Sequence, residues 1–564
     1  MKKIVFLLIS VLVLVSCTKD FVTKNPLGTE SDVTFFNTVD QCRQAVNAIY
    51  DPLAWIDTYG RSAELFDMLS DDAEKGGNPS SKSSYKSDQS FMYEIMLGNT
   101  TALNAIIGNF WKNYYVVIAR ANLMLDKTTD KENVAAYKEM RAEARFLRAF
   151  AYMDLVKLFG AVPLVDKVVV SADQAKTIGN RPDGKTADEQ IAAIYDFVIS
   201  ELTAIKGHLP MRQPDANFGM ATDAAVQAYL AKAYLYAGKF DEAYTTAKSL
   251  ITSAQGVYGL ESEYHKVFDF DKVRDESTIK EIVFAIQYIP SAGYNRDKGG
   301  EGTTRVIDCN PRVFADNAND DAVGYGLVIP TKTLVDAFEV GDPRLDLIAK
   351  ASYKNFEGKT VADSIYWTLK SNEPAKWRKV AKSPQNTGNY TLKHFVSFDV
   401  NKETGVNSQA QGKDLIMMRW AEVLLIGAEA AARTGKPEAT QWVNDIRKRA
   451  RESKCIERAP LMADYIFVKT GTIPADLPTV SLEDVKKERQ LELFCENGTR
   501  YFDLIRWNKT NDGDGISADE VLGAITKDLI GETRIWVPER QGLLPIPAKQ
   551  LILQGNSLIQ NSGY

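Results

Sequence analysis

Charged residues continue an apolar face in the segment SLEDVKKERQLELFCE, residues 481–496. At helical spacing Leu482, Val485, Arg489, Glu492 and Glu496 fall on one stripe, which predicts charges on a surface that faces the core. One interpretation is a catalytic pair of carboxylates. The other is a buried Arg–Glu network that locks the last helix to the helical core. We favour the network, because buried charged groups are commonly structural ion pairs.

A second cluster of the same kind follows in the next part of the chain. It contains Arg500, Asp503, Arg506 and Trp507, and we interpret it as structural too. The sequence contains no GxSxG, HExxH or P-loop motif, which are the common signatures of hydrolases, zinc proteases and nucleotide-binding enzymes. These residues therefore predict a protein that is not an enzyme.

Metal, cofactor and nucleic-acid binding are not expected. The three histidines are far apart in sequence, and the four cysteines beyond residue 17 form no CxxC pair. The segment NDGDGISADE (511–520) resembles a calcium loop, but with Gly515 at its sixth position the twelfth residue is Val521, so a solvated turn is favoured. The net charge of −6 argues against a nucleic-acid partner.

The N-terminus has the pattern of an export signal. Lys2 and Lys3 precede an apolar run from residue 4 to 15, which is shorter than the roughly 20 residues that span a bilayer. The residues before Cys17 resemble a bacterial lipobox, which predicts a signal peptide over 1–16, a lipidated Cys17 and a flexible tether over 17–37. The alternative is ordinary signal-peptide cleavage with Cys17 incidental.

Helical pairs predict the scaffold behind these residues. Thr38 and Gln41 match a capping box, so a helix is expected to start at Thr38, and a periodic apolar pattern over 132–159 ends at Gly160. Segments 228–251 and 423–450 resemble tetratricopeptide repeats, and 101–127 and 138–159 are weaker examples. The sequence predicts a mainly α fold: a TPR-like helical-pair scaffold in a single large globular domain, with long irregular loops and a few short strands.

The middle of the chain has a different residue pattern. Residues 280–289 and 394–400 have strand-like patterns, and 290–326 is rich in Gly, Asn and Asp without a helical period. Regular helices are expected to return at 414. We therefore divide the mature domain, 38–564, into an N-terminal helical part (38–260), a loop-rich insertion (261–415) and C-terminal helices with a tail (416–564).

Four stretches, taken together, resemble the signature blocks of the SusD/RagB family, the outer-membrane nutrient-binding lipoproteins of Bacteroidetes. They are AEARFLRAFAYMDLVKLFGAVPLV (142–165), MMRWAEVLLIGAEAAARTG (417–435), ERQLELFCENGTRYFDLIRW (488–507) and LLPIPAKQLILQGNSLIQNSGY (543–564). Weaker similarity occurs in TLVDAFEVGDPR (333–344). The blocks are collinear with the lipobox, and together they span almost the whole mature chain.

This resemblance implies a surface-exposed lipoprotein that captures an oligosaccharide and delivers it to a SusC-like TonB-dependent transporter in the outer membrane. It also implies polysaccharide utilisation as the setting, no catalysis, and an anchor through the lipid at Cys17. Two alternatives stay open: a peptide-binding member of the same family, and a TPR adaptor that binds only proteins. A screen of peptides against oligosaccharides would separate a peptide-binding member from a glycan-binding one, and glycan binding by a soluble chain without Cys17 would exclude the adaptor.

Sugar capture requires aromatic faces with polar side chains around them, and irregular segments outside a rigid scaffold are where binding residues concentrate. Two such regions are residues 55–62 taken with 78–93, and residues 288–326. The candidate ligand-binding residues are Trp55, Tyr59, Asn78, Tyr85, Tyr294, Asn295, Arg296 and Tyr325. Tyr229, Tyr234 and Tyr236 lie within the repeat helices and are predicted to belong to the core.

Overall fold

Helices dominate the part of the chain that the computed structural model describes. The described residues are 35–60, 63–76, 88–214, 217–268, 279–290, 302–309, 325–350, 353–354, 360–361, 366–367, 378–379, 389–394, 411–454, 471–528 and 531–564. The helices of the N-terminal half are α3 (Val39–Ala54), α4 (Ala63–Met68), α5 (Asp88–Met96), α6 (Ala105–Lys127), α7 (Ala135–Phe159), α8 (Ala172–Thr177), α9 (Ala187–Ile205), α10 (Asp223–Tyr236) and α11 (Phe240–Ser253). Those that follow are α12 (Arg305–Cys309), α13 (Lys332–Ala337), α15 (Trp420–Arg433), α16 (Glu438–Glu452), α17 (Leu482–Leu493), α18 (Thr499–Thr510), α19 (Ala518–Val521) and α20 (Ala548–Gln554).

The strands are short and pair two by two. They are β1 (Ala73–Lys75), β2 (Ile282–Ile286), β3 (Val328–Pro330), β4 (Ile348–Lys350), β5 (Tyr353–Lys354), β6 (Thr360–Val361), β7 (Tyr366–Trp367), β8 (Arg378–Lys379), β9 (Asn389–Thr391) and β10 (Leu415–Arg419). The pairs, all antiparallel, are β1–β3, β2–β10, β4–β9, β5–β6 and β7–β8. The described strands therefore form separate two-stranded pairs and build no larger sheet.

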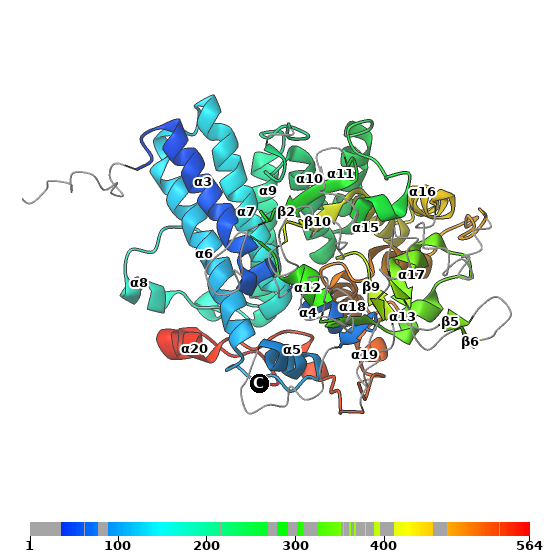
Figure 1. Cartoon of the computed structure of the whole chain (residues 1–564). Coiled ribbons are helices and arrows are strands. Elements are labelled where there is room, and N and C mark those ends of the chain that lie inside the picture. The colour runs from blue at the N-terminus through cyan, green and yellow to red at the C-terminus, as the bar shows by residue number, and fades with distance from the viewer. Residues whose placement is uncertain are drawn as a thin grey trace, which may run out of the picture.

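A continuous stack of helices forms the scaffold. Each of α6, α7, α9, α10, α11, α15 and α16 contacts the next helix in this order, and α3 packs against both α6 and α7. In Figure 1 the long helices α3, α6 and α7 lie together at one side, and the later helical pairs follow across the molecule. The predicted mainly α, TPR-like architecture is confirmed, and the two segments 101–127 and 138–159 pair with each other as α6 and α7.

Local signals set the helix ends as expected. The Thr38 hydroxyl accepts a hydrogen bond from the backbone amide of Gln41. The Gln41 side chain accepts one from the backbone amide of Thr38, so both halves of the capping box are formed. Helix α7 ends at Gly160, whose φ of 66° is the left-handed conformation that favours glycine. The tight turns within both repeat-like pairs contain a glycine in the same conformation, at Gly238 and Gly435.

Close packing between the repeat helices depends on small residues. A Cβ added at Gly427 of α15 would lie 2.9 Å from the ring of Trp442 in α16 and 3.3 Å from Ala247 in α11. Gly427→Leu is therefore expected to lower the free energy of unfolding by about 1–3 kcal/mol through overpacking. Gly108 of α6 is the control, because no described atom lies within 4 Å of its added Cβ. Thermal unfolding should separate the two leucine variants, and equal melting temperatures would contradict the close approach.

The middle segment differs from the sequence-based expectation in two places. The predicted strand at 280–289 is confirmed as β2, but its partner β10 occupies Leu415–Arg419, and helix begins again only at Trp420. The expected return of helix at 414 is therefore wrong by six residues. A five-residue helix, α12, also lies inside the 290–326 segment, which has no helical period. The strand predicted at 394–400 lies outside the described residues except for His394, which is in a turn.

Candidate functional site

The two aromatic segments singled out in the sequence meet at one place, which we call the loop junction (residues 55–60, 73–76, 302–309 and 325–330). Thr303 Oγ1 donates a hydrogen bond to the Gly60 carbonyl at 2.8 Å. The Gly76 amide donates to the Leu327 carbonyl at 2.7 Å, next to the pairing of β1 with β3. A Cβ on Gly76 would lie 2.0 Å from the Gly326 carbonyl, so this approach requires glycine. Chain segments more than 200 residues apart are thus held side by side.

Trp55 lies at the C-terminal end of α3 and is half-buried. Its indole N–H donates to Asp51 Oδ1 at 3.0 Å, and the guanidinium of Arg120 lies 5.6 Å from its ring. Arg120 also pairs with Asp51 at 2.9 Å. Because the N–H is bonded and Arg120 lies over one face of the ring, the other face is the part of Trp55 that remains for a ligand.

Tyr59 occupies a different environment from the one expected. A π-helical turn, Ile56–Gly60, follows α3, and Tyr59 on this turn is only 3 % exposed. Its ring packs against Tyr114 and Phe150, each with 6.2 Å between ring centroids. Tyr59 is therefore a core aromatic that stabilises the turn, and it does not present a face at the surface.

The remaining candidates divide between described and undescribed residues. Tyr325 is half-buried at the loop junction, and its amide donates to the Ile307 carbonyl of α12 at 2.7 Å. Cys17, Asn78, Tyr85, Tyr294, Asn295 and Arg296 lie outside the described residues. Of the core predictions, Tyr229 is buried, and Tyr234 and Tyr236 are half-buried and pack against the core.

Arg305 is a residue of the junction that sequence reasoning missed. It lies in α12 and is 1 % exposed, and its Nη2 donates to the carbonyls of Lys413 and Asp414 at 3.2 and 3.3 Å. The guanidinium also lies 5.7 Å from the ring of Tyr288. Arg305 therefore ties α12, and with it the 302–309 loop, to the chain that enters β10.

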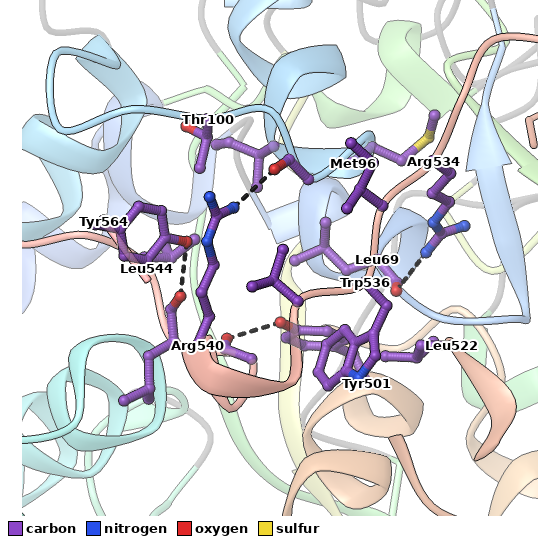
Figure 2. Close-up of a pocket in the computed structure, with 16 residues that line it drawn as sticks. Leu69, Met96, Thr100, Tyr501, Leu522, Arg534, Trp536, Arg540, Leu544 and Tyr564 are labelled. Carbon is purple, nitrogen blue, oxygen red and sulfur yellow. Dashed lines mark hydrogen bonds between the residues drawn. The ribbon is translucent and has the colours of Figure 1, made fainter. Parts of the chain in front are cut away.

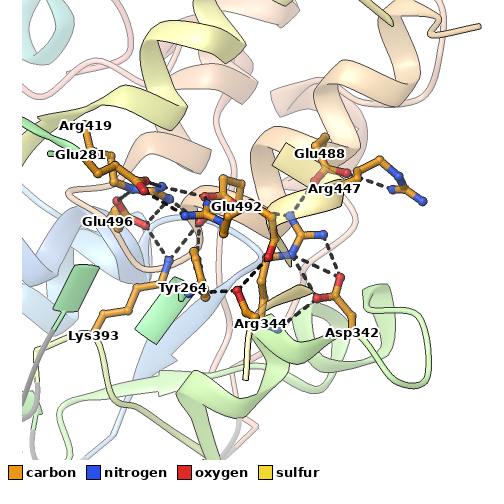
Figure 3. Close-up of polar contacts among 12 residues, drawn as sticks. Tyr264, Glu281, Asp342, Arg344, Lys393, Arg419, Arg447, Glu488, Glu492 and Glu496 are labelled. Carbon is orange, nitrogen blue, oxygen red and sulfur yellow. Dashed lines mark hydrogen bonds and ion pairs between the residues drawn. The ribbon is translucent and has the colours of Figure 1, made fainter. Parts of the chain in front are cut away.

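The charged stripe of α17 is a hub of ion pairs (Figure 3). Glu492 is fully buried and binds Arg419 at 2.6 Å, Arg344 at 3.1 Å and Arg449. Burial alone would raise the pKa of the Glu492 carboxyl, but the three guanidiniums outweigh it and hold that pKa well below its usual value. A carboxylate held ionised in this way is poorly suited to act as a general acid.

The network extends through both neighbours of this hub. Glu496 accepts from Arg419 at 2.8 Å and Lys393 at 2.6 Å, while Glu281 binds Arg419 at 2.7 Å and Arg449 at 2.9 Å. Because these partners come from the loop-rich insertion, β10 and α16, the network locks α17 to three separate parts of the fold. The predicted Arg–Glu network is confirmed.

The second predicted cluster is also a set of buried ion pairs. Glu429 of α15 accepts from both Nη atoms of Arg506 and, at 2.9 Å, from the indole N–H of Trp507. Arg489 pairs with Asp503 at 2.6 Å. Despite its burial, the positive neighbours lower the pKa of Glu429 to about 2. The cluster fastens α18 to the repeat helices.

The 511–520 turn was expected to be a solvated turn, but ion pairs tie it to the core. Lys486 of α17 is buried and lies 2.8 Å from Asp512 and 2.6 Å from Asp514, and Arg433 pairs with Asp512 at 2.8 Å. The carboxylates of this turn thus neutralise two cations of the core, Lys486 and Arg433. Within the described ranges no group of three His, Cys, Asp or Glu residues is arranged to hold a metal ion.

Asp67 is a buried carboxyl whose environment, unlike those of Glu492 and Glu429, favours the protonated form. Burial raises its pKa to about 8, although the Gly498 amide donates to Oδ1 at 2.7 Å and opposes the shift. The folded state therefore holds a proton that the unfolded chain releases near pH 4. The contribution of Asp67 to stability is complete below that value and is lost as the pH rises to about 8.

Asp67→Asn should remove this pH dependence while keeping the acceptor for Gly498. Between pH 5.5 and 7.5 the wild type is expected to lose stability relative to the variant, by up to about 1.4 kcal/mol per pH unit. Urea unfolding of both proteins across this range measures the difference. Parallel pH profiles would show that Asp67 is ionised in the folded protein.

Comparison with known proteins identifies the family. A family model described as the SusD family matches residues 280–564, which include residues 302–309 and 325–330 of the loop junction, the Glu492 hub and the C-terminal tail. The chain belongs to the SusD family. A second model, described as starch-binding associating with outer membrane, matches residues 31–235 of this SusD-family chain.

Relatives of this SusD-family protein match most or all of its length. SusD-like protein P2 from Formosa agariphila is 27 % identical and covers 100 % of this chain and 99 % of its own. The starch-binding protein SusD from Bacteroides thetaiotaomicron is 25 % identical over 69 % of this chain and 68 % of its own. The solved structure of surface glycan-binding protein A from Bacteroides thetaiotaomicron, in complex with laminarihexaose, has a TM-score of 0.70 at 24 % identity and covers 93 % of this chain and 99 % of its own.

The family blocks of this SusD-family chain build the scaffold. Arg419 and Glu429 come from the second block and Glu492 from the third, and they form the two ion-pair clusters. In the fourth block, Asn561 donates to the carbonyls of Phe159 and Leu544 at 3.0 and 2.8 Å, which fixes the tail to the end of α7. The signature residues therefore hold the helices in place, while the loop junction lies outside all four blocks.

No helix of the described residues is both long and apolar enough to cross a bilayer.

Proposed function

We propose that this SusD-family chain is a surface-exposed lipoprotein that captures an oligosaccharide and delivers it to a SusC-like TonB-dependent transporter of the outer membrane. The observation that carries the proposal is the loop junction, where segments far apart in sequence are fastened to a rigid helical body by Thr303–Gly60, Gly76–Leu327 and Arg305. A rigid scaffold that presents irregular aromatic segments is a common design for binding sites.

The ligand contacts are proposed at the junction and in the segments that enter it. Trp55 offers one ring face, since its N–H is already bonded, and Tyr325 lies half-buried three residues before β3. Tyr294 is proposed as the third aromatic, with Tyr85, Asn78, Asn295 and Arg296 as further contacts from segments adjoining the junction. Such rings bind the apolar face of a pyranose, and the amides and guanidinium bind its hydroxyls.

The names of the relatives favour a glycan over a peptide as the ligand. One relative is named a starch-binding protein. The family model that matches residues 31–235 is described as starch-binding associating with outer membrane. The carboxylates of Glu492 and Glu496 are paired, and their cationic neighbours lower the pKa of both, which supports binding without catalysis. We therefore expect no release of reducing sugar, and a peptide ligand or a protein-only adaptor role stays as the alternative.

The lipid anchor is proposed at Cys17. The described chain begins at Phe35, and Phe36 is buried with its carbonyl accepting from Lys131 Nζ at 2.7 Å. The globular body thus begins before Thr38, and the proposed tether between Cys17 and Phe35 would hold the domain near its transporter.

A binding screen tests the proposal. The soluble chain, with the residues through Cys17 removed, is run on native gels that contain single polysaccharides and is titrated with peptides in parallel. Retardation by at least one polysaccharide, without release of reducing sugar, is the expected result. Binding to peptides alone would favour the alternative, and co-purification of a TonB-dependent transporter with the lipidated chain tests the delivery step.

A further inference from the structure

Three aspartates fall within residues 67–72, where the chain enters the loop junction, and all three are buried. Asp67 lies near the end of α4, and Asp71 and Asp72 belong to the turn that precedes β1. Their exposed fractions are 3 %, 7 % and 1 %. A buried carboxylate is costly unless a cation or hydrogen bonds balance its charge. The contacts of the 69–72 turn therefore decide which of these groups can carry a charge at low cost.

Asp71 has a cation as its partner, and Asp72 has only a neutral donor. Arg500 donates to both oxygens of Asp71, from Nε at 2.9 Å and from Nη2 at 3.0 Å. Gln490 Nε2 donates to Asp72 Oδ1 at 2.8 Å, and Asp72 Oδ2 has no hydrogen-bond partner among the described residues. A carboxyl in this setting is buried at lower cost with a proton than without one.

Within the described part of the chain, no cation forms an ion pair with Asp72, because the cations nearby are bound elsewhere. Lys393 Nζ binds Glu496 at 2.6 Å. Arg534 Nη2 donates to the Leu69 carbonyl of the turn at 2.6 Å, as Figure 2 shows. The titratable and charged side chains around this turn are those of Asp67, Asp71, Glu74, Lys75, Lys393, Cys495, Glu496, Arg500 and Arg534.

The electrostatics of the turn agree with these contacts. Burial and the adjacent Asp71 carboxylate raise the pKa of Asp72 to about 7, and Arg500 opposes this rise only in part. When the turn opens to water, the same carboxyl ionises near pH 4. Opening therefore releases a proton, and its equilibrium constant rises up to about tenfold per pH unit between these two values.

The backbone of the same turn holds the loop junction together. Thr331, directly after β3, donates its amide to the Asp72 carbonyl at 2.9 Å and its hydroxyl to the Asp71 carbonyl at 2.6 Å. Strand β1 begins at the next residue, where Ala73 pairs with Pro330 of β3. Water can reach an ionised Asp72 only if the turn leaves these contacts. A charge on Asp72 therefore acts on the pairing of β1 with β3.

We propose that Asp72 is a proton-operated latch of the loop junction: its protonated carboxyl keeps the 69–72 turn closed on Thr331, and loss of the proton lets β1 separate from β3. The junction is then most rigid in mildly acidic solution and opens more often toward neutral pH. The regulatory consequence rests on the proposed function: more frequent opening speeds the release of a glycan held at the junction.

Hydrogen–deuterium exchange of the soluble chain without ligand tests the latch at pH 5.5 and 7.0. After correction for the intrinsic pH dependence of exchange, peptides that cover residues 73–76 and 327–331 should open about tenfold more often at pH 7.0. Lys75 does not disturb this comparison, because burial lowers its pKa only to about 8. Corrected exchange that is independent of pH in the wild type would overturn the proposal.

Variants assign the effect to Asp72. Asp72→Asn keeps the acceptor for Gln490 but does not titrate, so its junction peptides should open about equally at both pH values. Asp336→Asn is the matched control, because Asp336 is an exposed aspartate of α13 paired with Lys332, and it should respond as the wild type does.

Gln490→Lys keeps the proposal testable if Asp72→Asn fails to fold. Gln490 is half-buried, and an ammonium in its place would stabilise the ionised carboxylate of Asp72 and reduce the pH dependence of opening. A pH dependence equal to that of the wild type in either folded variant, Asp72→Asn or Gln490→Lys, would show that another group controls the junction.

Glycan release is measured separately, with a polysaccharide retained in the binding screen. It should dissociate faster from the wild type at pH 7.0 than at pH 5.5, by at most the factor found for opening, and equally fast from Asp72→Asn at both. Equal rates from the wild type would show that the latch does not regulate capture. Absence of any polysaccharide binding would contradict the proposed function, whereas the exchange experiment, which needs no ligand, decides on the latch by itself.

Discussion

Glu492→Gln is expected to lower the free energy of unfolding by about 3–5 kcal/mol or more. The substitution keeps the shape of the side chain but removes the negative charge that faces Arg344, Arg419 and Arg449. Those guanidiniums would then stay buried with too few carboxylates to balance them. Glu281 and Glu496 compensate only in part, because each already serves two cations.

A control for this variant lies on the same helix. Glu483 pairs with Lys487 one turn apart, and both side chains are exposed. Glu483→Gln should change stability very little, because an exposed ion pair in water contributes little. Thermal and urea unfolding, followed by far-UV circular dichroism, compare the two variants. Equal unfolding midpoints would show that the Glu492 hub does not hold the fold together.

Trp55→Ala combined with Tyr294→Ala is expected to weaken glycan capture about tenfold or more. Each substitution removes a ring that the proposal places against the apolar face of a sugar. The fold should survive the loss of Trp55, because this half-buried residue follows the last residue of α3, whose capping box at Thr38 is untouched.

Binding of the double variant is best measured by calorimetry with the polysaccharide found in the screen. Tyr234→Ala is the matched control, since Tyr234 is a half-buried aromatic of the repeat helix α10. The control should bind as the wild type does. Unchanged affinity of a folded double variant would place the glycan site away from Trp55 and Tyr294.

Local signals predicted much of the scaffold because they act within a few residues. The capping box at Thr38, the stop at Gly160 and the turns at Gly238 and Gly435 are all decided by neighbours in the sequence. The stripe of α17 also predicted buried charges correctly. Its partners were not predictable, because Arg344, Lys393 and Glu281 come from the loop-rich insertion, far from α17 in the sequence.

The predictions from the sequence were wrong where the environment of a residue depends on parts of the chain that are distant in sequence. The run LIMMR is apolar and leads directly into a helix, so only its pairing with β2, some 130 residues earlier, makes it a strand. Tyr59 lies in a polar loop sequence, but the π-helical turn directs it onto Tyr114. Helix α12 has five residues, too few to produce a period, and Arg305 within it was missed for that reason.

Hydrogen–deuterium exchange with and without the bound polysaccharide tests the central claim most directly, because it needs no substitution. Our account predicts that the ligand slows exchange in peptides that cover residues 55–60, 302–309 and 325–330. Peptides from α10 and α11 should exchange at the same rate in both states. Protection confined to the repeat helices, with the loop junction unchanged, would contradict the proposal that this junction binds the glycan.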